Sequence, residues 1–581
     1  MKYEPTTILS IAEQGFEKNK TGIVSAVKRN GKWIETSIED FKQMVQDLAL
    51  GLYELGVRKG DKVSLHAENS TEWLVIDQAV LTLGAVLVPI YTTQPGEQIE
   101  YILENSETKV HFVSNDDVFA ETKPLIKGIE NVKAVISIVD SNHNKLRAFD
   151  EILEMGHKKG EEDPALYDKL KGDVEPEDLA TLIYTSGTTG VPKGVMLTHD
   201  NIAGNALRAH EIFPFDPDDF DEPKVISYLP LAHMFERTAS YIYLYAGVPP
   251  YYIEDVESIK EDFAEIRPIY LVTVPRLLEK IVTGIKVKGQ EMSGIKKQLY
   301  YWAVNMAEEY DPENPPANWK MWLANKLVYS KIKELFGGRM VGFNVGGAAL
   351  SPNIARFING IGIYCGLGYG LTETSPVLTG PPVGELRIGS SGKAIADVEI
   401  KIAEDGEILA KGPNIMKGYY KMPEKTEEAI DDDGWLFVTD RKKSLFKLST
   451  GKYVAPQPIE NALVNSGFIE QAVVVGSEHK FCGALIVPNW ENMKKRFETT
   501  GHTFPEDNPA ENEFVIKRIQ KEVDKVNEDL SKWEKVKKFK LLEDQFTIED
   551  GEITPTLKVK RSVINKKYKE QIDSIYADEE S

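Results

Sequence analysis

The sequence contains little cysteine. Only two cysteines occur in 581 residues, Cys365 and Cys482, and they form no Cys-x-x-Cys pair. A disulfide framework or a cysteine-based zinc site therefore cannot organise this fold. Both thiols are predicted to be buried as small apolar side chains, in a protein of the reducing cytoplasm.

An excess of basic residues is also absent. The chain carries 69 Lys and Arg against 91 Asp and Glu, a formal net charge of -22. Proteins that bind DNA or RNA through phosphates usually present a basic surface, so nucleic acid is excluded as the main partner. An anionic small molecule would instead need a local pocket of positive potential.

No segment of the sequence reads as a membrane anchor. The first twenty residues contain acids and no long apolar stretch, which is unlike a secretory signal. The most apolar window, Trp73 to Tyr91, is interrupted by Asp77 and Pro89 and is predicted to be a buried helix leading into a strand. We expect a cytoplasmic protein. Peripheral contact with the inner membrane face and the oligomeric state stay open.

Length and periodicity indicate an α/β protein of more than one domain. Helical apolar spacing over 37–57 is followed by a short β-branched run, and this alternation recurs along the first half. Residues 276–337 are predicted to be almost wholly helical. We expect a large multi-subdomain N-terminal α/β domain over 1–440 and a small mobile α+β C-terminal domain over 441–581.

The strongest chemical signal is Tyr184-Thr-Ser-Gly-Thr-Thr-Gly-Val-Pro-Lys-Gly194, which follows the apolar run LATLI. Glycines and small hydroxyl residues let backbone N–H groups approach phosphate oxygens, and Ser186, Thr188 and Thr189 add side-chain donors. Lys193 contributes a compact positive charge. The spacing differs from a Walker A loop. A solvated turn is the alternative interpretation.

Five further motifs follow this loop in a definite order. They are YLPLAHMFER (228–237), GGAAL (346–350), GYGLTE (368–373), DRKK (440–443) and TPTLKVKR (554–561). Together with the loop they resemble the adenylate-forming superfamily, which includes acyl-CoA synthetases, luciferases and peptide-synthetase adenylation domains. The resemblance extends over nearly the whole chain. The helical block and the amino-acid sequence PLAHMFER are most similar to those of long-chain fatty acid–CoA ligases.

The resemblance implies an ATP site, with Mg²⁺ as the cofactor. Its residues would be Thr185, Ser186, Gly187, Thr188, Thr189, Gly190, Lys193, Gly346, Gly347, Ala348, Tyr369, Gly370, Thr372, Asp440 and Arg441. Within this set Tyr369 is expected on the adenine and Thr372 at the α-phosphate. Glu373 and Thr185 would supply the hard oxygen ligands that magnesium prefers.

The resemblance implies four catalytic residues, namely Thr372 and Glu373 together with His233 and Lys558. His233 is expected beside the acyl carboxylate, although a lone histidine among apolar residues is more often structural. Lys558 is expected to stabilise the negative charge that develops when a carboxylate attacks the α-phosphorus. Lys560 is the other candidate for this role in the lysine-rich tail. The alternative interpretation is that these lysines form a solvated face with no catalytic role.

The implied reaction has two halves. Fatty acid and MgATP give acyl-adenylate and pyrophosphate, and the C-terminal domain then rotates, with Lys443 as the hinge, so that the thiol of the co-substrate coenzyme A attacks the adenylate. Gly451 would line the CoA channel. Transfer to a carrier-protein thiol, or a non-catalytic nucleotide- or acyl-binding homologue, are the alternatives.

One departure from the family pattern concerns ATP. Members usually carry a Thr-Gly-Asp segment whose aspartate binds the ribose hydroxyls, yet here Asp433-Gly-Trp435 continues directly into Leu436-Phe-Val-Thr-Asp-Arg441. Either the natural chain holds a segment that this sequence omits, which we favour, or the segment is deleted. A deletion would remove a charge-assisted contact worth about 1.5–3 kcal/mol.

Overall fold

The computed structural model describes residues 4–577 except for 127, 140–142, 144–145, 186–190, 254, 405, 438–445, 465, 529, 548–549 and 554–558. The chain divides into two compact units. One comprises residues 1–277 with 288–438, and the other 278–287 with 439–581. The predicted domain boundary between residues 440 and 441 falls outside the described residues and stays a prediction.

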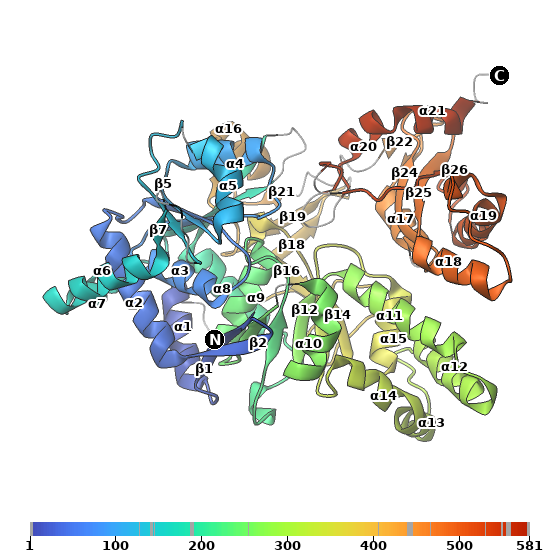
Figure 1. Ribbon diagram of the computed structural model, residues 1–581, viewed down its shortest axis with the longest axis horizontal. Coiled ribbons are helices and arrows are strands. Elements are labelled where there is room, and N and C mark those ends of the chain that lie inside the picture. The colour runs from blue at the N-terminus through green and yellow to red at the C-terminus, as the bar shows by residue number, and fades with distance from the viewer. Residues whose placement is uncertain are drawn as a thin grey trace. The chain divides into compact units, whose positions relative to one another are not determined.

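Two mainly parallel sheets form the centre of the large unit (Figure 1). The seven-stranded sheet has the order β14-β13-β12-β10-β11-β1-β2. Its strands are β14 (Tyr364–Leu367), β13 (Gly342–Val345), β12 (Tyr270–Thr273), β10 (Val225–Ser227), β11 (Pro250–Tyr252), β1 (Ile23–Arg29) and β2 (Lys32–Ser37). Only the β1–β2 hairpin at its edge is antiparallel.

The eight-stranded sheet has the order β20-β9-β8-β4-β3-β5-β6-β7. Its strands are β20 (Gly418–Tyr419), β9 (Lys193–Thr198), β8 (Leu179–Thr185), β4 (Val86–Ile90), β3 (Lys62–His66), β5 (Thr108–Val113), β6 (Ala134–Ser137) and β7 (Arg147–Ala148). The run from β8 through β7 is parallel, and β9 and β20 pair antiparallel at one edge.

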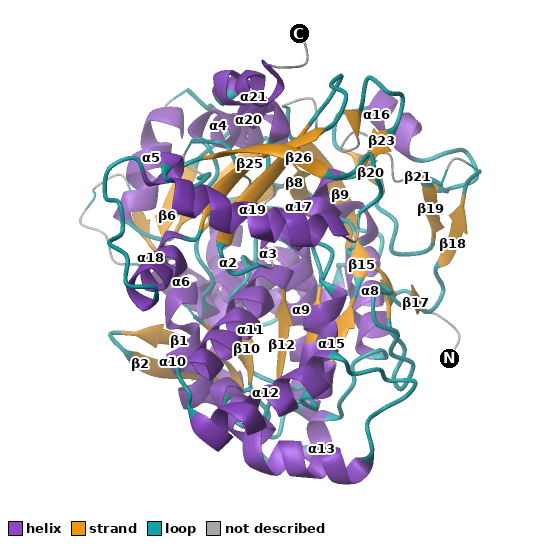
Figure 2. Ribbon diagram, turned by 90° about the vertical axis from the view of Figure 1, so that its right-hand side faces the viewer, coloured by secondary structure: helices purple, strands orange, loops and turns teal. Residues whose placement is uncertain are grey.

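Helices cover these sheets (Figure 2), as expected for parallel strands joined by helical crossovers. They are α1 (Ile8–Lys18), α2 (Ile38–Glu54), α3 (Thr71–Thr82), α4 (Gly96–Ser106), α5 (Asp116–Ile126), α6 (Phe149–Glu162), α7 (Leu166–Gly172), α8 (His199–His210), α9 (Met234–Tyr245), α10 (Ile259–Ile266), α15 (Pro352–Gly360) and α16 (Pro423–Ala429). Two small sheets complete the unit, β15 (Tyr369–Gly370) with β16 (Val377–Gly380) and β17 (Lys393–Ala394), and β18 (Glu399–Ile402) with β19 (Ile408–Lys411) and β21 (Leu436–Phe437).

Local sequence signals account for several of these elements. Helix α2 begins where Ser37 caps it, its side chain accepting from the Asp40 N–H. The apolar window at 73–91 forms helix α3 and strand β4, as predicted. The predicted helical block is also confirmed. It contains α11 (Pro275–Gln290), α12 (Gly294–Glu308), α13 (Asn318–Ala324), the π-helical turn η3 (Asn325–Tyr329) and α14 (Ser330–Lys333).

The small unit is built on a three-stranded sheet with helices on both faces. Its elements are β22 (Phe446–Lys447), β23 (Tyr453–Val454), α17 (Pro456–Val464), β24 (Ile469–Val475), β25 (Cys482–Pro488), α18 (Trp490–Thr499), α19 (Glu513–Glu528), β26 (Val536–Leu541), α20 (Arg561–Lys567) and α21 (Lys569–Tyr576). Val474 and Ile486 pack in one apolar cluster with α17 and α19, whereas Val473 and Leu485 pack with α20 and α21. This division follows from the period-two alternation of strand side chains.

The fold class predicted from the sequence is confirmed as α/β, with a larger N-terminal part and a smaller C-terminal part. Cys365 and Cys482 are both buried, and burial raises the pKa of each thiol to about 12. In the described part of the chain, no helix is long and apolar enough to cross a membrane.

A buried ion pair lies in the interior of the large unit. Arg237 on α9 donates through Nη2 to Asp77 Oδ1 on α3, and both side chains are almost completely buried. Arg237 Nη1 also donates to Thr181 Oγ1 on β8 over 2.8 Å. Tyr241 closes the group, because its hydroxyl accepts from Arg237 Nε and donates to Asp77 Oδ2. Helix α9 connects β10 to β11 of the seven-stranded sheet. These hydrogen bonds therefore join it to the eight-stranded sheet.

Substitution of Arg237 alone should therefore destabilise the protein strongly. Arg237→Leu leaves the Asp77 carboxylate buried without its partner, and we expect a loss of about 3–5 kcal/mol of unfolding free energy. Urea unfolding followed by circular dichroism measures the loss. The Asp77→Leu/Arg237→Leu double variant removes both charges and should recover much of it. A single variant as stable as the wild type would contradict this role.

Glu236 should make stability depend on pH. Burial raises the pKa of its carboxyl to about 8, and the Ser227 hydroxyl donates to its Oε1. A carboxyl whose pKa is raised on folding stabilises the folded state at pH values below its pKa in the unfolded state. This stabilisation is lost as the pH rises to about 8. Glu236→Gln mimics the neutral acid, so the variant should gain melting temperature over the wild type between about pH 4.5 and 8. Glu222→Gln, at an exposed position, is the control and should keep the wild-type dependence of melting temperature on pH. The same dependence in Glu236→Gln would contradict the assignment.

Candidate active site

The motifs predicted from the sequence follow the carboxyl ends of parallel strands. In the seven-stranded sheet, Tyr228 follows β10, Gly346 follows β13 and Gly368 follows β14. In the eight-stranded sheet, Thr185 ends β8, where the phosphate-loop motif begins. Ligands of α/β proteins bind at this edge, because loops there are free to shape a crevice. The tertiary fold therefore collects motifs that are far apart in the sequence.

Contacts between the two sheets' loops confirm that these edges meet. Asn69, which follows β3, donates to Leu229 O over 2.7 Å and accepts from Leu231 N over 2.8 Å. The ring of Tyr91, which follows β4, lies 6.5 Å from the ring of His233 between centroids. The motif 228–237 is therefore held against the eight-stranded sheet. Sequence reasoning missed Asn69 and Tyr91, for which no local pattern pointed to a function.

His233 caps the first turn of α9. Its Nδ1 accepts a hydrogen bond from the Phe235 N–H over 3.1 Å. A neutral imidazole that accepts through Nδ1 carries its proton on Nε2, so the ring presents an N–H donor on its other side. This hydrogen bond gives His233 a structural part at the start of α9, and its expected place beside the acyl carboxylate stays a prediction.

The glycine motifs lie where a neighbouring side chain or backbone group comes very close. A Cβ on Gly346 would lie 2.7 Å from the Phe235 ring, and one on Gly370 would lie 1.7 Å from Pro376 O. Gly347 adopts a φ of +76°, which other residues rarely tolerate. Ala348, Tyr369 and Thr372 are each half-buried beside these glycines along the same edge.

Tyr419 joins the phosphate-loop flank to the GYGLTE motif. Its hydroxyl donates to Glu373 Oε1 over 2.9 Å, and the Lys193 ammonium lies 4.3 Å from the centre of its ring. Strand pairing sets Lys193 directly opposite Thr185, so the predicted residues Thr185, Lys193 and Glu373 border one place. Sequence reasoning missed Tyr419, although Gly418-Tyr419 repeats the glycine–aromatic pattern of Gly368-Tyr369.

The cluster formed by Thr185, Lys193, Tyr419 and Glu373 combines one cation with oxygen ligands. The Lys193 ammonium makes a cation–π contact with the Tyr419 ring, and the Tyr419 hydroxyl donates to Glu373. A carboxylate has about four lone-pair sites, and Tyr419 engages one oxygen, so Glu373 retains acceptor capacity for a hard cation. Across the described residues, no three His, Cys, Asp or Glu side chains converge as a metal cage. This donor set fits Mg²⁺ that arrives with a phosphate ligand.

Several predicted residues lie outside the part of the chain that the structure describes. They are Ser186, Gly187, Thr188, Thr189, Gly190, Asp440, Arg441, Lys443 and Lys558. Their roles stay predictions, as does the origin of the missing Thr-Gly-Asp segment. Gly451 is described: it occupies the turn between β22 and β23 with a φ of +85°.

The described residues on either side of 554–558 are firmly held within the small unit. An antiparallel bridge joins Ile553 to Val559. The buried Glu552 carboxylate accepts from Tyr568 Oη over 2.7 Å and forms an ion pair with Lys567 over 2.9 Å. Arg561 makes two hydrogen bonds to the Glu460 carboxylate, of 2.6 and 2.7 Å. Both ends of the segment that contains Lys558 are therefore anchored.

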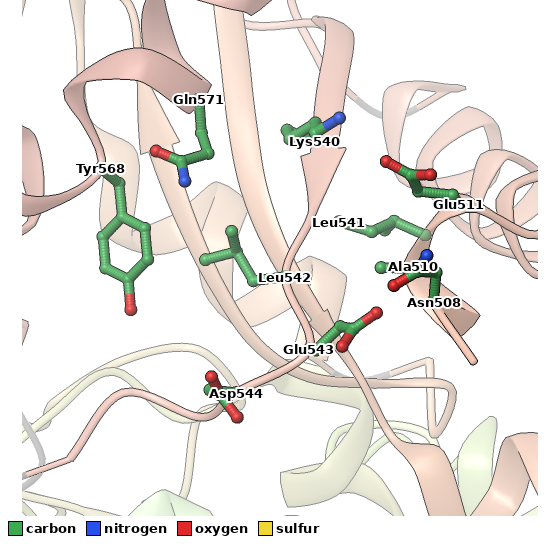
Figure 3. A pocket seen from close by; sticks show the side chains of 10 residues that line it. All are labelled: Asn508, Ala510, Glu511, Lys540, Leu541, Leu542, Glu543, Asp544, Tyr568 and Gln571. Atoms are coloured by element: carbon green, nitrogen blue, oxygen red, sulfur yellow. The ribbon is translucent and has the colours of Figure 1, made fainter. Parts of the chain in front are cut away.

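A hollow of about 290 Å³ also opens in the small unit (Figure 3). Figure 3 shows the carboxylates of Glu511, Glu543 and Asp544 among its side chains, with Lys540 as its only cation. Three acids against one ammonium disfavour a polyphosphate there. None of the predicted site residues that the structure describes lines this hollow.

Comparison with known proteins agrees with this geometry. A family profile described as AMP-binding enzyme matches residues 14–420, and one described as AMP-binding enzyme C-terminal domain matches residues 443–580. Long-chain-fatty-acid–CoA ligase FadD15 of Mycobacterium bovis is 32% identical over 569 residues, covering 94% of this chain and 93% of that protein. The chloroplastic long-chain-fatty-acid–[acyl-carrier-protein] ligase AEE15 of Arabidopsis thaliana is 28% identical over 626 residues, covering 94% and 83%.

A solved structure shares the fold. The A domain of a carboxylic acid reductase from Segniliparus rugosus, in complex with AMP and a co-purified carboxylic acid, aligns with a TM-score of 0.73 and 22% identity, covering 99% of this chain and 95% of that one. The resemblance drawn from the six motifs is confirmed by the family match. The chain belongs to the AMP-binding enzyme family, the adenylate-forming ligases.

Proposed function

We propose that this adenylate-forming ligase activates a long-chain fatty acid with MgATP and transfers the acyl group to coenzyme A. The observation that carries the proposal is the cluster of Thr185, Lys193, Tyr419 and Glu373 at the same strand edge as His233. The similarity to FadD15 of M. bovis, over nearly the full length of both chains, supports the choice of acid and acceptor.

In the first half-reaction a carboxylate oxygen of the fatty acid attacks the α-phosphorus of ATP. A new P–O bond forms, the bond to the β-phosphate oxygen breaks, and pyrophosphate leaves with its electron pair. Lys193 would neutralise phosphate charge, and the glycine backbone at 346–347 would let the nucleotide approach closely. Tyr369 offers its ring to the adenine, and Thr372 offers its hydroxyl to the α-phosphate.

His233 and Lys558 have separate roles in this step. The Nε2–H of a neutral His233 donates to the acyl carboxylate and orients it without proton transfer. Lys558, supplied by the tail, stabilises the charge on the phosphoryl oxygens in the transition state. Glu373 and Thr185 would hold Mg²⁺, which when bound would neutralise charge on the phosphates.

In the second half-reaction the CoA thiol gives up its proton to solvent and its thiolate sulfur attacks the acyl carbonyl carbon. A C–S bond forms, the C–O bond to the phosphate breaks, and AMP leaves as the anion. We assign residues 1–440 to the ATP and acyl domain and 441–581 to a lid that rotates at Lys443, so that Gly451 lines the CoA channel. Asp440 and Arg441, beside that hinge, would contact the nucleotide.

Two alternatives remain distinct from this proposal. A carrier-protein thiol is the acceptor named for the A. thaliana relative AEE15. A non-catalytic binding protein is suggested by the absent ribose aspartate, and it would release no pyrophosphate from fatty acid and MgATP.

Lys558→Ala tests the chemistry. With palmitate, ATP, Mg²⁺ and CoA, we expect AMP and pyrophosphate formation to fall at least about a hundredfold, because a transition-state charge partner is lost. Thioester formation from preformed palmitoyl-adenylate should be retained. Lys560→Ala is the matched control and should stay near wild type. If Lys560→Ala loses activity and Lys558→Ala does not, the lysine has been misassigned; if the wild type forms no AMP, the enzyme proposal fails.

A substrate matrix tests the acid and the acceptor. Acids from acetate to oleate should be offered with CoA and, separately, with a phosphopantetheinylated carrier protein, and kcat/KM measured for each. We expect the highest value for long-chain acids with CoA, since added methylenes gain binding energy in an apolar tunnel. A preference for acetate would reject the long-chain assignment, and a preference for the carrier protein would replace CoA as the acceptor.

A further inference from the structure

One helix of the large unit exposes two tryptophans. Helix α13, the turn η3 and helix α14 continue without a break from residue 318 to 333. Ala324, Val328 and Ile332 are buried on one side of this helix. Trp319 and Trp322, three residues apart and hence neighbours on a helix surface, remain 64% and 62% exposed.

The neighbouring helix α12 adds further exposed apolar area. The Tyr329 hydroxyl of η3 donates to Ala303 O of α12 over 2.7 Å, so the two helices are in contact. Ile295 and Leu299, spaced four residues apart on α12, are 75% and 37% exposed. Large apolar side chains exposed on two helices that are in contact are candidates for an interaction site. Figures 1 and 2 both place α13 at the edge of the large unit.

The charge of this helix is opposite to that of the whole chain. Residues 318–333 contain four lysines and no aspartate or glutamate, in a protein of net charge -22. The Lys320 ammonium lies 5.8 Å from the Trp319 ring centre, and that of Lys326 lies 5.0 Å from the Trp322 ring centre. Each exposed tryptophan is therefore paired with a cation rather than covered by protein.

Exposed tryptophans beside lysines match the chemistry of a bilayer interface. Indole rings are preferred at the headgroup level, and lysines attract anionic lipids from the aqueous side. A helix of this type lies in the plane of the interface and does not span it. A symmetric contact with a second copy of this chain is disfavoured, because it would bring like-charged lysines together.

We propose that Ile295, Leu299, Trp319, Lys320, Trp322 and Lys326, here named the α12–α13 surface, dock the protein on an anionic membrane. The tryptophan and aliphatic side chains enter the headgroup region, while the lysines contact lipid phosphates. Docking needs no ATP, acid or CoA, so it is independent of the proposed reaction.

Co-sedimentation of the full chain with vesicles tests the proposal. Vesicles of phosphatidylcholine alone are compared with vesicles that contain phosphatidylglycerol, at 0.1 M and 0.5 M salt. We expect binding to the anionic vesicles that falls at high salt. Trp319→Ser/Trp322→Ser should weaken the partition coefficient at least tenfold, and Lys320→Gln/Lys326→Gln by roughly fivefold per lysine.

Matched substitutions elsewhere provide the controls. Ile34→Ser/Ile402→Ser removes two other exposed apolar side chains, and Lys517→Gln/Lys521→Gln removes two other exposed lysines. Both should bind vesicles like the wild type, and circular dichroism should show every variant folded. Equal binding by the tryptophan variant and the wild type would overturn the proposal. So would self-association that the tryptophan variant abolishes in sedimentation velocity while neither protein binds vesicles.

Discussion

The buried pair of Arg237 and Asp77 is the interaction on which the large unit depends. An ion pair removed from water stabilises little in net terms, but its geometry is strict because every donor and acceptor must be satisfied. Here the guanidinium reaches Asp77 on α3, Thr181 on β8 and Tyr241 on its own helix. Helix α9 is consequently registered against the strand that enters the phosphate loop.

That registration has a direct consequence for the site. The first turn of α9 begins at His233, and Asn69 and Tyr91 hold the preceding loop against the eight-stranded sheet. The motif 228–237 and the end of β8 are thus held in one arrangement. Because parallel strands direct their carboxyl ends to one edge, separate motifs meet without any long-range sequence signal.

Charge is distributed locally and not uniformly. A chain of net charge -22 must create positive potential where it binds anions. Lys193 places one positive charge at the start of β9, with its ammonium 4.3 Å from the centre of the Tyr419 ring. The α12–α13 surface does so on a larger scale with lysines and tryptophans. In both places an aromatic ring lies beside the cation.

The sequence by itself determined the α/β class, the helical block over 276–337, the order of six motifs and hence the family. These properties follow from local periodicity, capping and contiguous residue types. All three are present within short segments of the sequence. Only the tertiary structure decided that Tyr419 joins Lys193 to Glu373, that Asn69 and Tyr91 support His233, and that Trp319 and Trp322 face outward. Such contacts depend on which strands become neighbours and which helix face is left uncovered, and a single sequence does not encode either locally.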